Sequence, residues 1–385
     1  MSKQTKNIPK HRFPQFANEK GWEVKKLGEA CFNIASGKDK NEDNGIYNLY
    51  GSTGIIGKTN SVSYDGDFIL VARVGANAGF LNRVNSKFGV TDNTLVISLA
   101  NFQSVDFIYY NLENFGLNKL VFGSGQPLIT GGQLKNLELF FPSSLKEQQK
   151  IASCLSSLDE VITAESQKLD VLKEHKKGLL QNLFPQEGEK VPKMRFKEFK
   201  GEWEEKKLGE VATFVNEKTP LENLSISSYI STENILPDFA GVTSASKLPT
   251  SGNFTKYRKG DVLISNIRPY LKKVWFSDKE GAGSNDVFVV RTKSDIQDFF
   301  LSFLLKNDNF INYVMVGAKG VKMPGGDKDL ISKYPISFPS KTEQQKIASG
   351  LSSLDEIIQA QAEKIELLQL HKKGLLQGLF PKMND

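Results

Sequence analysis

Two segments of the chain carry apolar residues at spacings that alternate between four and three, the pattern of a coiled-coil seam. Ser144 with Glu147, and Ser340 with Glu343, have capping-box spacing, and a Phe-Pro pair ends each segment. These signals predict helices over 144–185 and 341–383, each about 57 Å long at the usual helical rise. The expected seam residues are Ile151, Leu155, Leu158, Ile162, Leu169, Leu172, Leu179 and Leu183 in the first segment, and Ile347, Leu351, Leu354, Ile358, Ile365, Leu368, Leu375 and Leu379 in the second.

The two helical segments are copies of one sequence. Residues 147–185 and 343–381 align at a constant offset of 196, and 27 of their 39 positions are identical. A weaker repeat opens each half: a series of Arg-Phe, Trp-Glu and Lys-Lys-Leu-Gly-Glu motifs begins at Arg12 and recurs from Arg195. The chain is therefore predicted to be a duplicated unit, each copy consisting of a globular head followed by a helix.

The segments before the helices read as α+β heads. Short alternating apolar runs interrupted by glycine are typical of strands, and 297–309 has a helical pattern. The predicted fold is α+β, with two globular heads joined by two long antiparallel coiled-coil helices that a pseudo-twofold axis relates. The expected boundaries are 11–143 and 194–340 for the heads, 144–185 and 341–383 for the helices and 186–193 for the linker; the clearest expected strands are 67–73, 93–97, 261–265 and 287–290.

Polar residues interrupt the seam and predict how the helices pair. In an antiparallel pair, the numbers of facing residues have a constant sum. A sum of 537 places Glu165 opposite Lys372 and Lys176 opposite Gln361, with apolar residues facing one another elsewhere. A slip of one heptad would leave the Glu165 carboxylate without its cation, which is costly in a desolvated seam. The four polar residues are therefore expected to fix the register.

Charge is unevenly distributed along the chain. The formal net charge is +6, yet residues 145–185 hold six basic and six acidic residues, and residues 341–381 hold five of each. The positive surplus therefore belongs to the heads and the linker, which favours a polyanionic partner such as nucleic acid. Ordinary surface lysine is the alternative explanation.

Signals of other protein classes are weak. The two cysteines, Cys31 and Cys154, predict no disulfide framework, and no apolar run approaches 18 residues, so we expect a cytoplasmic protein without a membrane segment. Residues 51–59 resemble a phosphate-binding loop, but their glycine spacing is wrong and no helical pattern follows. The three histidines lie outside any pattern of metal ligands. We therefore expect no catalytic site, metal or cofactor in this chain.

Polar side chains between the glycines of the heads are candidates for DNA contacts. Arginine, asparagine and glutamine can pair with base edges, whereas lysine favours phosphate. In both heads a Gly-Asp strand leads to an arginine, Arg73 or Arg268. The candidates are Lys58, Asn60, Arg73, Asn77 and Gln126 in the first head, and Lys256, Arg258, Asn266, Arg268, Lys272, Lys319 and Lys322 in the second.

Together these motifs resemble the specificity subunit of type I restriction–modification enzymes. The resemblance covers essentially the whole chain, and it is most specific in the Glu-Gln-Gln-Lys-Ile-Ala helices that end in Lys-Lys-Gly-Leu-Leu-Gln-x-Leu-Phe-Pro. It implies that each head is a target recognition domain for one half of a bipartite duplex DNA site. It also implies that the helices set the spacer between the half-sites.

The resemblance further implies partners that carry the chemistry. Two modification subunits would bind S-adenosylmethionine and methylate adenine, and two restriction subunits would use ATP and Mg²⁺. The chain itself would be non-catalytic. Two other classes remain open: a two-headed scaffold that binds proteins, which would show no salt-dependent duplex binding, and a fused enzyme, which would show cofactor binding or turnover by the purified chain.

Overall fold

The computed structural model describes residues 7–382 except 101–102, 124, 187 and 318–324. The chain forms two compact units, and each long helix contributes a segment to both. Unit 1 consists of Met1–Gln167 with Ala362–Asp385, and unit 2 of Lys168–Gln361. Each unit therefore contains one head, the start of the helix that follows this head and the end of the other helix.

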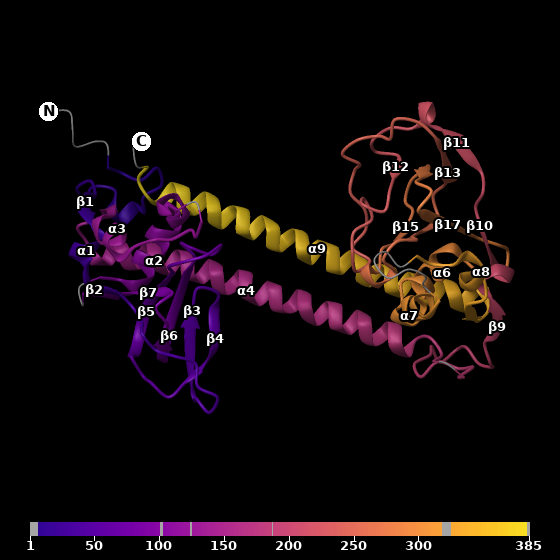
Figure 1. The fold of residues 1–385 in the computed structure, drawn as a ribbon, viewed down its shortest axis with the longest axis horizontal. Helices are drawn as coiled ribbons and strands as arrows, with labels where there is room; N and C mark the ends of the chain where they lie inside the picture. The colour runs from indigo at the N-terminus through magenta and orange to yellow at the C-terminus, as the bar shows by residue number, and fades with distance from the viewer. Residues whose placement is uncertain (1–6, 101–102, 124, 187, 318–324, 383–385) are drawn as a thin grey trace. The chain divides into compact units, whose positions relative to one another are not determined.

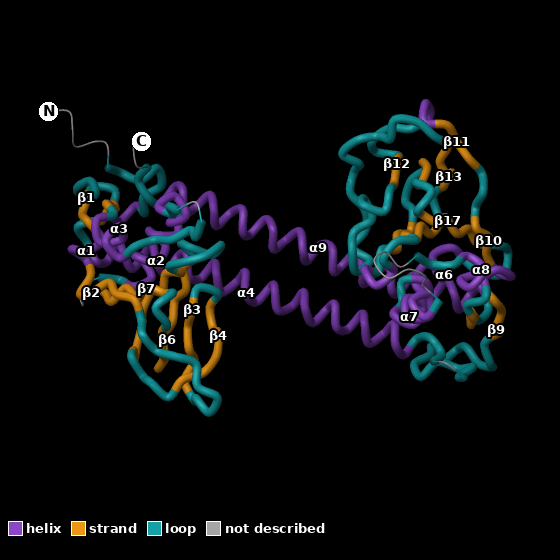
Figure 2. The backbone as a smooth tube through the Cα atoms, viewed as in Figure 1, coloured by secondary structure: helices purple, strands orange, loops and turns teal. Residues whose placement is uncertain are grey.

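The head of unit 1 is built on a six-stranded sheet with strand order β2-β7-β5-β6-β3-β4. Strands β1 and β8, which precede and follow the six strands in the chain, form a separate antiparallel pair. The short helices of the head lie on the side near α4 (Figures 1 and 2). Its elements are β1 (Glu23–Lys26), α1 (Leu27–Ala30), β2 (Cys31–Ser36), β3 (Tyr47–Gly51), β4 (Gly54–Thr59), β5 (Tyr64–Ala72), β6 (Leu81–Val90), β7 (Thr94–Leu99), α2 (Val105–Phe115), α3 (Gly131–Asn136), β8 (Glu138–Phe141) and α4 (Leu145–Asn182), with 3-10 turns at Pro14–Phe16 and Leu117–Leu120.

The glycine-rich segment 51–59 is a β-hairpin. Strand β3 ends at Gly51, β4 begins at Gly54, and Gly54 takes a φ of 92°, which favours glycine. No helix follows the hairpin, so its backbone amides pair within the sheet instead of facing a phosphate.

The head of unit 2 distributes its strands over two four-stranded sheets, β10-β17-β14-β15 and β11-β13-β16-β12. The expected helix over 297–309 is divided in two, because α6 ends at Leu305 and α7 begins at Asp308. The elements are β9 (Glu204–Lys207), α5 (Leu208–Val211), β10 (Ala212–Phe214), β11 (Lys218–Pro220), β12 (Tyr229–Ile230), β13 (Asn253–Tyr257), β14 (Val262–Ser265), β15 (Val274–Phe276), β16 (Gly281–Gly283), β17 (Val287–Thr292), α6 (Asp298–Leu305), α7 (Asp308–Val316), α8 (Lys328–Ser332), β18 (Pro335–Phe338) and α9 (Lys341–Leu379), with 3-10 turns at Leu221–Asn223 and Pro269–Leu271.

The core of each unit includes residues of both long helices. In unit 1, Phe380 packs against Trp22 and Phe107, with ring centroids 5.9 and 5.5 Å away. In unit 2, Phe184 occupies the equivalent place against Trp203 and Phe300, at 6.2 and 5.5 Å. The Phe-Pro pair that ends each helix therefore anchors that end in the head of the unit.

A buried ion pair joins each head to the start of its helix. In unit 1, Arg12 donates from Nε and Nη2 to the two oxygens of Glu147 at 2.7 and 2.8 Å, and Trp22 Nε1 donates to the same carboxylate at 3.3 Å. In unit 2, Arg195 forms the same paired hydrogen bonds with Glu343, both at 2.8 Å. The sequence predicted these glutamates as capping residues, and in the structure their carboxylates accept from arginine.

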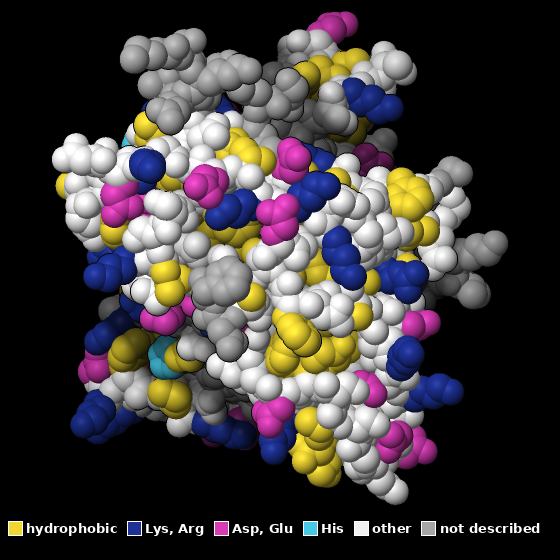
Figure 3. All heavy atoms as spheres, turned by 90° about the vertical axis from the view of Figure 1, so that its left-hand side faces the viewer, with side chains coloured by type: hydrophobic (Ala, Val, Ile, Leu, Met, Phe, Trp, Pro, Cys, Tyr) yellow, Lys and Arg dark blue, Asp and Glu magenta, His cyan; other side chains and the backbone are white. Residues whose placement is uncertain are grey.

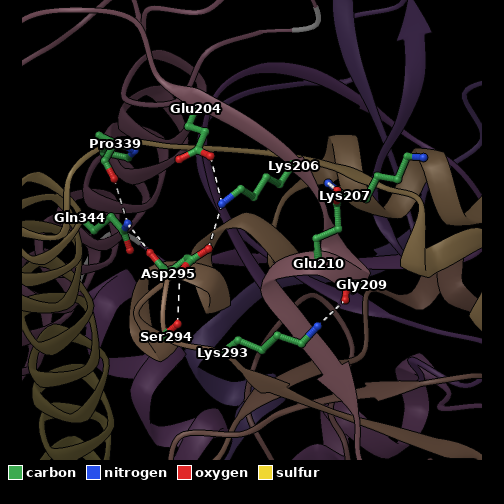
Figure 4. Close-up of polar contacts among 10 residues, drawn as sticks. All are labelled: Glu204, Lys206, Lys207, Gly209, Glu210, Lys293, Ser294, Asp295, Pro339 and Gln344. Atoms are coloured by element: carbon green, nitrogen blue, oxygen red, sulfur yellow. Dashed lines mark hydrogen bonds and ion pairs between the residues drawn. The ribbon is translucent and has the colours of Figure 1, made fainter.

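The glutamine after each glutamate ties the helix to a second part of the head. Gln344 donates to the carbonyls of Pro339 and Asp295 (Figure 4). It also accepts from the backbone N–H of Gln297 at 2.8 Å. The Asp295 carboxylate binds Lys206 Nζ at 2.9 Å, and this hydrogen bond lowers the pKa of Asp295. In unit 1, Gln148 accepts from Ser104 N–H in the same way. The repeated Glu-Gln-Gln sequence thus serves as the joint between head and helix.

The two helix segments run antiparallel within each unit, but the predicted register is wrong. In unit 1, Lys372 binds Asp159 at 2.9 Å and Glu165 binds Lys364. In unit 2, Lys176 binds Asp355. The two lysine–aspartate pairs have number sums of 531 (372 + 159 and 176 + 355), not 537.

The predicted register considered only polar residues within the seam. It left out the carboxylates beside the seam and the acidic side chains of the heads. Asp159 and Asp355 each follow a seam leucine, so they meet the lysines in the observed register. Gln361, the fourth predicted register residue, is buried at 6% exposure. The seam itself is confirmed: each of its predicted residues is buried or half-buried, whereas Val171 and Leu367 outside it are exposed.

The heads complete this polar layer with opposite charges. In unit 1, Glu113 of α2 binds Lys372 at 3.0 Å, and Tyr110 donates to Asp159. Burial acts to lower the pKa of Lys372, but its hydrogen bonds to Asp159 and Glu113 outweigh burial and raise it. In unit 2, Lys306 follows α6, where burial and the nearby Lys176 lower its pKa to about 8.

Breaking one Arg–Glu joint should destabilise its unit strongly. Arg195→Ala would leave the Glu343 carboxylate, 2% exposed, without its cation, which should cost about 3 kcal/mol. Calorimetric unfolding of the full chain measures this loss. Lys346→Ala is the matched control, because Lys346 forms an exposed pair with Glu198 and should change stability by about 0.5 kcal/mol or less. Equal effects of the two substitutions would contradict a structural role for the buried joint.

Replacing Lys306 should stabilise unit 2 at neutral pH. The folded-state pKa of Lys306 is about 8, below its ordinary value, so the unfolded chain binds more protons between about pH 8 and 10. The contribution of this group to stability therefore rises with pH across that window. Lys306→Met should raise stability at pH 7 by roughly 2 kcal/mol, with a gain that shrinks toward pH 10. Calorimetry of both proteins from pH 7 to 10 checks this, and a gain independent of pH would rule out titration of Lys306.

Candidate nucleic-acid interface

In the first head, the loop between β5 and β6 lies against the segment that precedes α3. Gly75 N–H donates to the Pro127 carbonyl at 2.9 Å, and Val74 forms a β-bridge with Leu128. The loop turns at Gly75 and Gly79, which have φ of 83° and 90°. These two segments are far apart in sequence, but backbone hydrogen bonds hold them side by side.

This pairing brings three of the candidate residues into neighbouring loops. Asn77 and Gln126 are exposed, one on each of the paired segments. Arg73 is half-buried, and its Nη1 donates to the Asp92 carbonyl at 3.1 Å while its own carbonyl accepts from Ile129 N–H. The side chain of Arg73 thus already has a structural role, and Asn77 and Gln126 are freer to meet a ligand.

The other two candidates of the first head belong to the edge of the sheet. Lys58 is exposed on β4 and donates to Asn48 Oδ1 at 2.8 Å. Asn60, just beyond β4, donates to Glu42 at 2.6 Å. Both side chains are exposed but hold local hydrogen bonds that a ligand would have to replace or share.

In the second head, the loop between β14 and β15 has the same backbone pairing. Gly326 N–H donates to the Asn266 carbonyl, and in the first head Ile129 N–H donates to the Arg73 carbonyl in the same way. The β-bridge between Ile267 and Gly325 is likewise equivalent to the bridge between Val74 and Leu128. Arg73 therefore corresponds to Asn266. Arg268 lies two positions beyond Asn266, so the two arginines that follow the Gly-Asp strands do not occupy equivalent positions.

The second-head loop presents an arginine and a tyrosine. Arg268 is exposed, and Tyr270 is 50% exposed. Lys272 is half-buried and binds Asp308 at 2.7 Å, so it is a less available contact. Asn266 is half-buried, and Lys319 and Lys322 lie outside the described residues.

Lys256 and Arg258 lie apart from this loop, beside a shallow hollow of about 450 Å³ on the second sheet. Lys256 binds Glu217 at 2.8 Å, and this hydrogen bond lowers the pKa of Glu217. Arg291 also lines the hollow and binds the buried Asp261 at 2.7 Å. Acidic partners compensate much of this positive charge, which is unfavourable for a dedicated phosphate site.

Exposed aromatic residues were missed by the sequence reasoning. Phe80 and Phe122 are 58% and 51% exposed on the paired loops of the first head, as Tyr270 is on the second. The sequence did contain a signal for Phe80 and Phe122, because each of them lies in or beside a glycine-rich turn. Turns lie at the surface, so an aromatic side chain there is expected to be exposed. Figure 3 shows lysine and arginine interspersed with acidic side chains on the face of unit 1 that it presents, so no patch of a single charge marks this face.

Metal ligands and reactive thiols bear on whether the described residues could carry a catalytic site. None of their His, Cys, Asp and Glu side chains form a group of three or more suited to a metal ion. Burial raises the pKa of Cys31 to about 12, which disfavours its thiolate. Within the same residues no helix is long and apolar enough to cross a membrane.

Comparison with known proteins gives a consistent family. A sequence model described as "Type I restriction modification DNA specificity domain" matches residues 19–174 and 200–369, one match in each half of the chain. The specificity subunit of EcoDI from Escherichia coli is 24% identical over 401 residues, which cover 94% of this chain and 87% of that protein. The MjaVIII specificity subunit of Methanocaldococcus jannaschii is 25% identical over 81% of this chain and 78% of its own length. The EcoprrI specificity subunit of Escherichia coli is 32% identical, but over only 31% of this chain and 30% of that protein.

Solved structures share the fold. The S subunit of a type I restriction–modification system from M. genitalium superposes with a TM-score of 0.64 at 18% identity, over 98% of this chain and all of that one. The family match spans both duplicated halves, and the structural likeness covers nearly every residue. This chain belongs to the family of type I restriction–modification DNA specificity proteins.

Proposed function

We propose that this chain is the DNA-recognition subunit of a type I restriction–modification complex, and that each head reads one half of a bipartite duplex site. The observation that carries the proposal is the pair of homologous loops described above. They share one backbone pairing but present Asn77 and Gln126 in one head, and Arg268 and Tyr270 in the other. A common frame with different exposed side chains suits the reading of two different sequences.

The joints between heads and helices support a spacer role. Each head is held to its helix by a buried arginine–glutamate pair and to the end of the other helix by a buried phenylalanine. Rigid attachment lowers the entropy lost when two linked heads bind one duplex. In this proposal the helices determine which separations of half-sites the heads can engage together.

The chemistry would belong to partner subunits. Modification subunits would bind S-adenosylmethionine and methylate adenine after it leaves the stack, and restriction subunits would use ATP and Mg²⁺. A solved structure with a TM-score of 0.56 at 16% identity is described as the structural basis of complex assembly and conformational transition of the type I R-M system. Two modification subunits and two restriction subunits are the proposed complement for this chain.

An apolar face of α9 is a candidate for docking a modification subunit. Leu367 and Leu370 are 66% and 63% exposed, and they lie one helical turn apart, outside the seam. They line a shallow hollow of about 530 Å³ with Glu363, Glu366, Gln369 and Lys373. Exposed apolar side chains rimmed by polar ones are typical of a protein interface.

Exchange of one head should change one half-site only. If residues 194–340 are replaced by the second head of a relative with another target, the first half-site and the spacer should remain. Methylation-sensitive sequencing of DNA from cells that express the complex reads both half-sites at once. Simultaneous changes in both half-sites would show that the heads do not read independently.

Polar substitution on α9 should weaken assembly without unfolding the chain. The double change Leu367→Ser and Leu370→Ser removes exposed apolar surface, so the affinity for the modification subunit should fall about tenfold or more, while thermal unfolding shifts little. Analytical ultracentrifugation of mixtures with the modification subunit measures this. Ile46→Ser, at 68% exposure in the first head, is the matched control and should assemble normally. Normal assembly of the double variant would exclude this face.

A further inference from the structure

The loops that correspond in the two heads each contain two residues in the left-handed backbone region, four positions apart. In the first head these are Gly75 and Gly79, with φ of 83° and 90°. In the second head the same positions are Arg268 and Lys272, with φ of 52° and 53°. The first head thus uses the residue that adopts this conformation freely, and the second uses two residues that do not.

The strain is concentrated around this one loop. Among the described residues, the only others with positive φ apart from glycine are Asp238 and Phe239. Their backbone N–H groups donate to the carbonyls of Leu271 and Lys272, both at 3.0 Å. All four strained residues therefore belong to one hydrogen-bonded group in the second head.

Neighbouring parts of the second head hold the loop in place. Lys272 binds Asp308 at the start of α7, and Lys273 Nζ donates to the Thr232 carbonyl at 2.7 Å. On another side, Ile267 forms its bridge with Gly325. Such contacts can maintain a conformation that the loop residues disfavour on their own, an arrangement that is common at binding sites.

The loop leaves two side chains exposed. Among the described residues the Arg268 side chain has no ion-pair or hydrogen-bond partner, although the Arg268 carbonyl accepts from Leu271 N–H at 2.9 Å. Tyr270, two positions later, is 50% exposed. Lys272 is engaged by Asp308 and serves to hold the backbone. A planar cation beside an aromatic ring suits the phosphates, sugars and base edges of a duplex.

We propose that the segment 266–273 is the DNA-contacting element of the second head, with Arg268 and Tyr270 as its contacts and Lys272 as a positioning residue. The inference rests on the proposed function and adds the element and the residues that perform it. In this proposal the ligand requires the arginine side chain, which accounts for an arginine in the left-handed region where the first head has glycine.

Three variants separate strain from binding. Arg268→Ala removes the side chain and keeps the strain, Arg268→Gly removes both, and Tyr270→Ala removes the ring. Arg268→Gly should therefore unfold at a higher temperature than Arg268→Ala. Both should nevertheless bind duplex about tenfold or more weakly than the unmodified chain, and Tyr270→Ala should also bind more weakly. Lys197→Ala, an exposed lysine near the helix joint, is the control and should bind normally.

The probe is a duplex selected from a randomised pool by the unmodified chain assembled with its modification subunits. Fluorescence anisotropy at several salt concentrations then gives affinities and salt slopes. A smaller slope, by about one unit, assigns Arg268 to a phosphate, and a changed preference at one base position assigns it to a base edge. Either result supports the proposal.

Failure of this proposal is distinct from failure of the proposed function. If the unmodified complex selects a duplex and both Arg268 variants bind it with unchanged affinity, the loop is not the contact. If the unmodified complex selects no duplex but binds an acidic protein, the DNA-recognition function itself is wrong. Loss of binding in Arg268→Gly with retained thermal stability is the result that we expect.

Discussion

The structure depends on one buried ion pair, formed twice, at the start of each long helix. Arg12 with Glu147 and Arg195 with Glu343 are almost fully withdrawn from water, and both arginines bind with two parallel hydrogen bonds. Such a pair is geometrically demanding, because loss of either partner leaves a buried charge uncompensated. It therefore fixes the direction in which the helix leaves the head. The adjacent glutamine and the phenylalanine from the end of the other helix add restraint to the same region.

Duplication preserved this joint while the heads diverged around it. The lysine–aspartate pairs between the helices are equivalent in the two units, yet the head adds Glu113 beside one and Lys306 near the other. The recognition loops show the same relation, since their backbone pairing is shared but their exposed residues differ. The joint is therefore the same in both units, whereas the sheets of the heads and the exposed residues of their loops differ, as expected when the joint is structural and the loops bind different ligands.

The sequence was informative where its pattern was periodic or repeated. It predicted the two helices, the seam, the duplication and several strands, because each depends on local spacing. The helix register was wrong, since Asp159 and Asp355 lie beside the seam and the partner Glu113 comes from a distant helix. The sequence also did not show that Arg73 and Arg268 occupy different positions, because the equivalence of Arg73 with Asn266 depends on backbone hydrogen bonds from the distant Ile129 and Gly326. The predicted DNA contacts stay predictions, with Arg73 and Lys272 now weaker candidates and Arg268 a stronger one.

The central claim is that two rigidly attached heads read two half-sites at a separation that the helices set. The most direct test is methylation-sensitive long-read sequencing of a genome in a cell whose only adenine-methylating complex contains this chain. The account predicts a single bipartite motif, with two specified half-sites separated by a fixed number of unspecified base pairs. One uninterrupted motif, or half-sites found at variable separations, would contradict it.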